Sequence, residues 1–572
     1  MSSPIRFGIF EADLDAGDLR RKGFRLKLQN QPFRVLAALL ERPGELVTRE
    51  ELKDRVWASR TLVDFERGLN KAINRLRIAL NDSAENPALI ETLPRRGYRF
   101  IGAIERRMNS LAVLPILNLS GHSDQEHWAD GLTDELIGHI ARIKALRVIS
   151  RTSVMRFKAS LLTLPEISRQ LGVDAVVQGS IQFVNERVRF RIALIDARND
   201  RHLWSDQFES SLGNIANLQA DMAHTITRQV QAWLGDVTEI AAHRSGTPFL
   251  KREAYEAYLK GRLFWNRRTE GDFERAIECF ERAVALEPSY AEAYAGLADT
   301  FVMKAIFGLC APCEVYPKAM AAAQRAIELN EGLAEAHNCL GDILKGYEWD
   351  WSGAENAYKH ALQLNPNYSV AHQWYSGLLL ILGRNELAIA AANKARELDP
   401  LSLPINAFLG YVCMKAERFD QAVKASAGAI ELDPNNPFGH WIMARTLDAM
   451  NDLPGAAEEA KAAARLSSDR MPYSAQLGYA WARLGERKRA REVVDRLKDL
   501  AKGRYVSAYP IAAIYAALED RNAAFEWLER AYVERTPRLL ELPDVAFANL
   551  GPDPRFRDLL KRIGAASYEH PH

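Results

Sequence analysis

Nine side chains within the first hundred residues are of the kinds that proteins use to contact nucleic acid. Arg and Asn can form paired hydrogen bonds to guanine and adenine edges, and Arg and Lys also bind phosphate oxygens. The nine fall into three short groups: Lys71, Asn74, Arg75 and Arg77; Arg95, Arg96 and Arg99; and Thr48 with Arg49. The chemistry that they predict is recognition of a polyanion, with no bond made or broken.

The first group lies on a predicted helix. Four apolar side chains fall at i, i+4, i+7 and i+11, a spacing that places them on one stripe facing a core. These four are Leu69, Ile73, Leu76 and Leu80. The other face of the helix then carries the polar group of residues 71–77. A solvated polar face is the alternative interpretation of the same pattern.

The second group surrounds Gly97 at the tip of a β-hairpin that we predict over residues 90–100. The third group begins another helix, because Thr48-Arg49-Glu50-Glu51 has the sequence of a capping box. Ahead of these elements, alternating apolar and polar residues over 5–28 predict a small antiparallel sheet, and residues 31–42 predict a helix. The basic groups are therefore presented by a sheet, three helices and a terminal hairpin, in that order.

The charge of the chain is concentrated in the same segment. Residues 1–107 carry 21 basic and 15 acidic side chains, a net charge of +6, whereas the remainder carries 54 and 59, a net charge of −5. A basic front on a slightly acidic body predicts that a polyanion is bound near the N-terminus. This excess, together with the order of the elements, favours DNA binding over a merely solvated surface.

The Asn-Arg-Leu-Arg sequence at residues 74–77 and the Gly-Tyr-Arg-Phe ending at 97–100 resemble the winged helix-turn-helix domain of OmpR/PhoB-type regulators. The resemblance covers residues 5–103. It implies that the third helix enters the major groove of duplex DNA and that the hairpin tip reaches the adjacent minor groove. It also implies that Arg49, near a helix N-terminus, lies on the phosphate side.

Two features that accompany this domain elsewhere are not expected here. The domain starts at the N-terminus, so we expect no phosphoryl-receiving domain in front of it. No window approaches 18 uninterrupted apolar residues, so we expect no transmembrane helix of the kind that CadC- and ToxR-like sensors carry. With five cysteines and no signal peptide, the sequence predicts a cytoplasmic protein whose signal arrives through the rest of the chain.

Residues 108–245 have a mixed α/β pattern. Helices are predicted over residues 126–143 and 215–234, and a run of three antiparallel strands begins at residue 174. Three phrases resemble the TolB N-terminal-like domain, and the resemblance implies a fold but little about activity. They are Leu-Pro-Ile-Leu-Asn-Leu-Ser-Gly at 114–121, Ala-Asp-Gly-Leu-Thr-Asp-Glu-Leu at 129–136 and Val-Gln-Gly-Ser at 177–180.

No catalytic residue, metal or cofactor is expected. One acidic and histidine-containing cluster, made of His122, Asp124, Glu126, His127 and Asp130, is spread over a Gly-Ser loop and a helix start. Acidic residues gather at helix N-termini to complement the dipole, which accounts for the cluster without a metal. The sequence also has no glycine-rich phosphate loop and no His-Glu-x-x-His, so an enzyme is the least favoured interpretation.

The second half of the chain is repetitive. A leucine, usually followed by an acidic or amide residue and proline, recurs at Leu286, Leu329, Leu364, Leu398, Leu432 and Leu466, at intervals of 43, 35, 34, 34 and 34 residues. An alanine-rich helix before each breaker and a period near 34 are typical of tetratricopeptide (TPR) repeats. The longest interval predicts an insertion of about nine residues around 307–316. Residues 553–560 predict a capping helix.

A TPR solenoid binds partners along the groove formed by the first helix of each repeat. Tyr411, Trp441 and Arg445 fall at groove positions and are our candidates for holding a peptide or a small effector. Packing within the array is the alternative role of Tyr411 and Trp441.

We therefore expect a multidomain chain with an α+β winged helix (1–107), a mixed α/β domain (108–245) and an all-α TPR solenoid (250–572). The function predicted is a one-component transcription regulator. Its expected partners are duplex DNA, RNA polymerase or another regulator, and a protein or peptide in the TPR groove, with no membrane partner. The alternative is a TPR interaction scaffold that does not bind DNA sequence-specifically.

Overall fold

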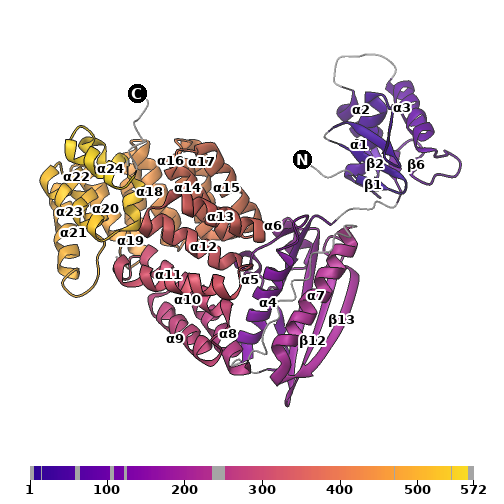
Figure 1. Ribbon diagram of the computed structural model, residues 1–572. Helices are drawn as coiled ribbons and strands as arrows, with labels where there is room; N and C mark the ends of the chain where they lie inside the picture. Colours follow the sequence, from indigo (N-terminus) through magenta and orange to yellow (C-terminus); the bar gives the residue numbers. More distant parts are fainter. Residues whose placement is uncertain are drawn as a thin grey trace. The chain divides into compact units, whose positions relative to one another are not determined.

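The computed structural model describes residues 5–14, 16–57, 65–102, 108–121, 125–234, 251–468, 470–542 and 544–564 (Figure 1). The chain forms two compact units. Unit 1 is Met1–Met108 with Trp233–Gly235, and unit 2 is Asn109–Ala232 with Asp236–His572. The boundaries predicted at residue 107 and at residues 245–250 lie outside the described residues.

Unit 1 begins with a four-stranded antiparallel sheet in the order β1-β2-β3-β4. The alternating pattern puts Phe7, Phe10 and Leu19 into the core of the unit. The strands are β1 (Ile5–Phe7), β2 (Phe10–Asp13), β3 (Asp18–Arg21) and β4 (Phe24–Leu26).

Three helices and a second sheet complete unit 1, as predicted. The strand that precedes α2 pairs with the terminal hairpin, which gives the order β5-β7-β6. The stripe of Leu69, Ile73, Leu76 and Leu80 is buried in the core that α1 and the hairpin share. The elements are α1 (Asn30–Glu41), β5 (Val47–Thr48), α2 (Arg49–Val56), α3 (Phe65–Leu80), β6 (Ile90–Leu93) and β7 (Gly97–Phe100).

The first part of unit 2, hereafter the middle domain, is built on a mixed sheet in the order β10-β8-β11-β12-β13, with β9 paired to β11. The pairs among β8, β9, β10 and β11 are parallel, whereas β11, β12 and β13 are antiparallel. The strands are β8 (Ser110–Val113), β9 (Leu117–Asn118), β10 (Arg147–Val148), β11 (Ala175–Val184), β12 (Arg187–Asp196) and β13 (Arg201–Ser211). The predicted three-stranded antiparallel run is confirmed.

Helices join these strands. The predicted final helix of the middle domain is confirmed as α7, and α4 is slightly shorter than expected. The helices are α4 (Glu126–Ile140), α5 (Arg151–Met155), α6 (Leu164–Leu171), the 3-10 turn η2 (Leu212–Asn214) and α7 (Ile215–Leu234). Glu126 and Asp130, from the acidic cluster of the sequence, both pair with Lys158 Nζ, at 2.8 and 2.5 Å.

The rest of unit 2 is the predicted helical array, in which helix pairs stack in chain order (Figure 1). Its helices are α8 (Arg252–Arg267), α9 (Glu270–Leu286), α10 (Ala291–Ile306), α11 (Pro312–Leu329), α12 (Ala334–Ile343), the π-helical turn η3 (Leu344–Glu348), α13 (Trp351–Leu364), α14 (Ser369–Ile381), α15 (Asn385–Leu398), α16 (Leu403–Lys415), α17 (Phe419–Leu432), α18 (Pro437–Ala449), α19 (Leu453–Leu466), α20 (Tyr473–Arg483), α21 (Arg487–Leu500), α22 (Ala508–Ala517) and α23 (Arg521–Val533).

Alanine allows the two helices of a repeat to approach closely. Ala354, Ala361, Ala388 and Ala395 are all fully buried, and so are their equivalents in the repeats on either side. The insertion predicted around residues 307–316 is taken up mainly by longer helices: α10 and α11 have 16 and 18 residues, against 13 and 14 in α14 and α15.

After the last helix pair the chain turns back along the array. It forms two 3-10 helices, η4 (Pro537–Glu541) and η5 (Val545–Leu550), and then the predicted capping helix as α24 (Pro554–Arg562). We call residues 536–550 the return segment. Its apolar side chains Leu539, Phe547 and Leu550 are buried in the core formed with α20 to α24.

The middle domain is attached to the array through the turns that follow two of the repeat leucines. Asn367 donates to the carbonyls of Ala141 and Leu146 at 2.8 and 2.9 Å. Asp399 accepts from the backbone N–H and the hydroxyl of Ser153 at 2.9 and 2.5 Å. We call residues 365–367 and 399–401 the docking turns. Polar residues in the turns after two repeat helices therefore hold the middle domain.

Candidate nucleic-acid interface

The outward face of α3 carries the predicted base-contacting side chains. Lys71 and Asn74 are exposed, and within the described part of the chain neither forms a hydrogen bond or ion pair. Arg75 is exposed as well and bonds only the Gln29 side chain. Ile78 lies one turn beyond Asn74 and is 80% exposed. An apolar side chain left in water on a basic helix face suggests a contact completed by another molecule.

Arg77 does not share that face, so its predicted exposure is wrong. The side chain is buried, and its Nη2 donates to the carbonyl oxygen of Ile90 at 2.7 Å and to Thr92 Oγ1 at 2.9 Å. It therefore ties α3 to the first strand of the hairpin and positions that strand. Residue 77 lies four after Ile73 and three before Leu80, so the helical spacing could have assigned it to the buried flank.

The start of α2 is held against α3 and the hairpin by Tyr98, which sequence reasoning missed. Its hydroxyl donates to Asn70 Oδ1 at 3.0 Å and accepts from Arg49 Nη2 at 3.3 Å. Arg49 also pairs with Glu66 and lies over the Tyr98 ring at 5.4 Å. Arg49 is thus largely engaged within the unit, close to the N-terminus of α2.

Thr48 caps α2, and the predicted capping box is present. The Glu51 N–H donates to Thr48 Oγ1 at 3.2 Å, and the Thr48 N–H donates to Glu51 Oε2 at 2.8 Å. The bond from Arg42, together with those that the Thr48 N–H and hydroxyl donate to the Glu51 carboxylate, lowers the pKa of Glu51 to about 2. The box fixes where α2 begins and leaves the Thr48 hydroxyl with a structural role.

The hairpin tip exposes two of its three arginines. Arg95 and Arg96 are exposed, and Arg95 adopts a left-handed conformation with φ 60°. Arg99 pairs with Glu91 across the hairpin at 3.0 Å. A Cβ at Gly97 would collide with the Val47 carbonyl oxygen, so only glycine lets the hairpin approach β5. The glycine thus brings the arginine turn beside the start of α2.

The predicted partner groove is covered by the chain itself, and this is a correction. Arg445 is 7% exposed, and its Nη2 bonds Glu541 Oε2 at 2.7 Å and Asp544 Oδ2 at 2.9 Å, both in the return segment. Lys415 donates to the Glu541 carbonyl at 2.9 Å. Burial acts to raise the pKa of Asp544, but the charges of Lys415 and Arg445 outweigh it and lower the pKa to about 2.

Tyr411 and Trp441 flank this ion cluster. The Arg445 guanidinium lies 5.1 Å from the Tyr411 ring centre and 5.4 Å from the Trp441 ring centre. The guanidinium of Arg538, which belongs to the return segment, lies 5.2 Å from the Trp441 ring centre. These contacts agree with the alternative interpretation of the sequence, in which Tyr411 and Trp441 pack within the array. Their role in binding a separate partner stays a prediction.

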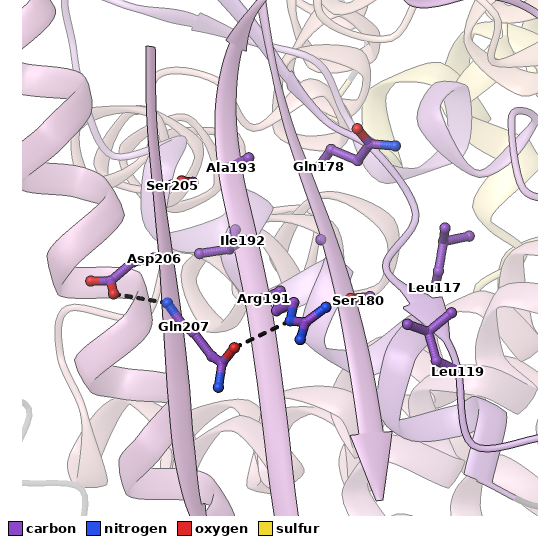
Figure 2. Close-up of a pocket in the computed structure, with 11 residues that line it drawn as sticks. Leu117, Leu119, Gln178, Ser180, Arg191, Ile192, Ala193, Ser205, Asp206 and Gln207 are labelled. Atoms are coloured by element: carbon purple, nitrogen blue, oxygen red, sulfur yellow. Dashed lines mark hydrogen bonds between the residues drawn. The ribbon is translucent and has the colours of Figure 1, made fainter. Parts of the chain in front are cut away.

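A shallow depression also lies on the middle-domain sheet, beside Leu117 and Leu119 (Figure 2). Its two charged side chains already have partners. Arg191 Nε donates to Gln207 Oε1 at 3.2 Å, and Asp206 accepts from the backbone N–H of Gln207 at 2.8 Å (Figure 2). The depression therefore resembles an open polar sheet face more than a built site.

Comparison with known families supports the order of domains. Residues 23–100 match the family model "Transcriptional regulatory protein, C terminal", and residues 107–225 match "HilA/YgeH-like transcriptional regulator, second domain". Residues 267–304 and 403–436 match models of TPR repeats. The chain has the domains of a transcription regulator. The middle domain corresponds to the second domain of HilA-like regulators, and its TolB-like resemblance stays a prediction.

Individual relatives agree over part of the chain. The transcriptional regulator HilA of Salmonella typhimurium is 22% identical over 405 residues, which is 69% of this chain and 70% of that protein. The cholera toxin homolog transcriptional activator of Vibrio parahaemolyticus is 38% identical over 81 residues, 14% of this chain and 28% of the relative. A Rhizobium meliloti protein named "Putative adenylate cyclase 3" is 29% identical over 192 residues. This chain covers 32% of that protein's length, and the match takes up 33% of this chain.

Among the residues that the structure describes, no helix is both long and apolar enough to cross a lipid bilayer.

Proposed function

We propose that this regulator binds duplex DNA through unit 1, with α3 in the major groove and the β6–β7 turn in the adjacent minor groove. The observation that carries the proposal is a difference among the side chains of α2, α3 and the hairpin: some are exposed and unpaired, and others are bonded within the unit. Lys71, Asn74, Arg95 and Arg96 are exposed and unpaired within the described residues. The neighbouring Arg49, Arg77 and Arg99 are instead held by carboxylates or carbonyls of the unit.

The exposed set divides by chemistry. Asn74 and Arg75 would contact base edges, since amide and guanidinium groups can bond adenine and guanine in pairs. Ile78, on the same face, would contact a thymine methyl group. Lys71 would bind phosphate, and Arg95 and Arg96 would enter the narrow groove, where the negative potential is strongest.

Four of the predicted contact residues act differently in this proposal. Arg49 and Arg99 are paired within the unit, so they would hold α2 and the hairpin in place and reach phosphate with whatever donors remain. Arg77 and Thr48 have structural roles only. The domain limits 1–107, 108–245 and 250–572 and the TolB-like character of the middle domain remain predictions.

The rest of the chain would carry the signal. We propose that the TPR array receives a protein or peptide partner and that RNA polymerase or another regulator is contacted at the promoter, in the cytoplasm. Repeat arrays present extended binding surfaces, which supports the first part. The groove at Arg445 becomes available to a partner only when the return segment leaves it.

The test uses the full-length chain and a library of random-sequence duplex DNA. We expect selection to enrich a defined motif, with an affinity that falls steeply with salt because bound cations are released from the phosphates. Lys71→Ala should reduce affinity for all sequences, and Asn74→Ala should relax the enriched motif. Arg20→Gln, an exposed change on the four-stranded sheet, is the matched control and should have neither effect.

Recovery of no motif, together with an affinity that does not depend on salt, would favour the alternative of a TPR scaffold without sequence-specific DNA binding.

A further inference from the structure

A cavity of about 250 Å³ lies where the middle domain meets the first repeats. Its walls come from α4 and the start of α5 on one side and from α8, α10 and the first docking turn on the other. Arg262 of α8 holds the two sides together, with Nε and Nη2 bonding Asp134 Oδ2 at 3.1 and 2.8 Å. The cavity is therefore part of a fixed contact within one compact unit.

Two of the carboxylates that line this cavity, those of Asp299 and Glu135, have no cation bonded to them among the described residues. Asp299 on α10 forms no hydrogen bond or ion pair within the described residues, and burial raises its pKa to about 7. Glu135 on α4 bonds Tyr255, and burial with the nearby charge of Glu292 raises the pKa of Glu135 to about 8. The charge of Arg262 acts on both groups and that of Arg268 acts on Asp299, but within the described residues neither arginine is bonded to them. A charged carboxylate removed from water without a bonded cation is costly.

The guanidinium of Arg268 in the same cavity is near the charge of Asp299 but, among the described residues, is not bonded to a carboxylate. Arg268, at the end of α8, has φ 53°, a left-handed conformation that is unfavourable for a residue other than glycine. Its guanidinium carbon lies 4.9 Å from the centre of the Trp265 ring, and among the described residues it forms no ion pair. Burial lowers its pKa. The chain thus holds a cation in the cavity at a conformational cost.

The two unmatched charges restrict what can occupy the cavity. A simple anion would leave Asp299 without a bonded partner, and a simple cation would leave Arg268 without one. A molecule that carries one group of each sign satisfies both sides, because each charge then meets its opposite away from water.

The walls and the size limit the body of that molecule. The rings of Tyr258 and Tyr290 lie 5.0 Å apart in the cavity wall, and the Trp265 ring is beside them. Aromatic faces accept both an apolar body and a cationic nitrogen. The volume falls below the roughly 300–1,000 Å³ of pockets that hold drug-sized ligands, so the occupant is small.

We propose that this cavity binds a small zwitterion of the amino-acid type, with its ammonium group on Asp299 and its carboxylate on Arg268. Such a ligand would touch the middle domain and the array at once and would strengthen their contact. The inference goes beyond DNA binding by unit 1 and does not depend on it.

The test begins with the full-length chain and each protein amino acid in turn, at about 10 mM, in thermal melts and titration calorimetry. We expect at least one amino acid to raise the Tm in a concentration-dependent way. The amine that lacks its carboxylate and the acid that lacks its amine should both leave the Tm unchanged. Neither compound should bind, because the cavity requires a positive and a negative group on the same molecule.

Two variants and a control connect the binding to the cavity. Asp299→Asn and Arg268→Gln should each weaken binding about thirtyfold or more, since each removes one partner of a buried charge pair. Arg267→Gln changes the neighbouring arginine, whose side chain is 53% exposed and lies outside the cavity, and should bind like the parent. Without ligand, Asp299→Asn should melt no lower than the parent, because it removes an unpaired charge.

Three results would overturn the proposal: no amino acid raises the Tm, an amine alone binds as tightly as its amino acid, or Asp299→Asn binds like the parent. None of these readouts involves DNA, so failure here is distinguishable from failure of the DNA-binding proposal.

Discussion

Arginine has opposite surroundings in two regions of this molecule. On α3 and the hairpin tip, Arg75, Arg95 and Arg96 are exposed and form no ion pair within the described residues. On α18, Arg445 is 7% exposed and bonds two carboxylates of the return segment. Both places are rich in basic and aromatic residues, and the sequence alone made both candidates for binding.

The difference shows that a carboxylate partner within the chain decides whether an arginine stabilises the fold or is available for binding. A cation that the chain has already paired contributes to the fold, and its removal leaves carboxylates buried without compensation. A cation that the chain leaves in water contributes little to stability and is available to another molecule. Stability and binding measurements on matched arginine variants should therefore move in opposite directions in the two regions.

The largest expected effect is on the stability of unit 2. Arg445→Ala should lower its free energy of unfolding by about 3–5 kcal/mol, because Glu541 and Asp544 would lose a buried cation. Urea denaturation followed by tryptophan fluorescence measures the loss. Arg418→Ala is the control, since its ion pair with Glu386 is exposed. A loss below about 1 kcal/mol for Arg445→Ala would contradict the assignment of this cluster to the fold.

Base discrimination is the second prediction. Asn74→Ala and Arg75→Ala should each reduce the preference for the selected DNA over random duplex by about 1–3 kcal/mol, because each removes a paired contact to a base edge. Competition binding at fixed salt gives this difference. The unfolding free energy should stay within about 0.5 kcal/mol of the parent. If affinity falls equally for all sequences, α3 does not contact base edges.

Arg77→Ala tests the boundary between the two classes within α3 itself. It should destabilise unit 1 by about 1–3 kcal/mol, because it leaves the Ile90 carbonyl and Thr92 without their buried donor. The preference among DNA sequences should persist at temperatures where the unit is folded. Circular dichroism melts of unit 1 and competition binding separate the two effects. If the variant is as stable as the parent and prefers other DNA sequences, Arg77 contacts DNA and its assignment to the buried side of α3 is wrong.

The smallest effect is expected at Lys71. Lys71→Ala should change unfolding by less than about 0.5 kcal/mol, because the side chain has no partner within the described residues. It should lower the slope of log affinity against log salt by about 0.9, the contribution of one phosphate contact. Binding isotherms across a salt series measure the slope, and an unchanged slope would remove Lys71 from the phosphate contacts.

Much of the fold could be predicted from local patterns. Apolar spacing identified α3 and α7, the Thr48 capping box marked the start of α2, and the repeat period identified the array. The helix spacing and the capping box lie within a few residues along the chain, and the repeat period recurs at a nearly fixed interval that is visible without the fold. The mixed sheet of the middle domain was also anticipated as a pattern, although the short helix α5 was not.

The parts that could not be predicted depend on contacts between distant residues. The partners of Arg445 lie 96 and 99 residues further along, and no local pattern indicates that the chain returns to cover the groove. Asp399 was interpreted only as a helix-ending residue and Asn367 was not singled out, yet their partners in the middle domain lie more than 200 residues earlier. Whether a charge is paired depends on the folded chain. Residue type and spacing could therefore propose α3 and the groove as binding sites, but could not show that only the groove arginine is paired internally.

The return segment has a consequence for how this array can change during evolution. Repeat proteins usually gain or lose units freely, because each unit contacts only its neighbours. Here the middle domain is fixed to the turns at Asn367 and Asp399, and the segment around Glu541 reaches back to Arg445. A unit added or removed between residues 445 and 541 would displace the carboxylates from their arginine, and one added or removed between 367 and 399 would displace Ser153 from its aspartate. Both stretches therefore have a fixed number of repeats, although the sequence that encodes them is periodic.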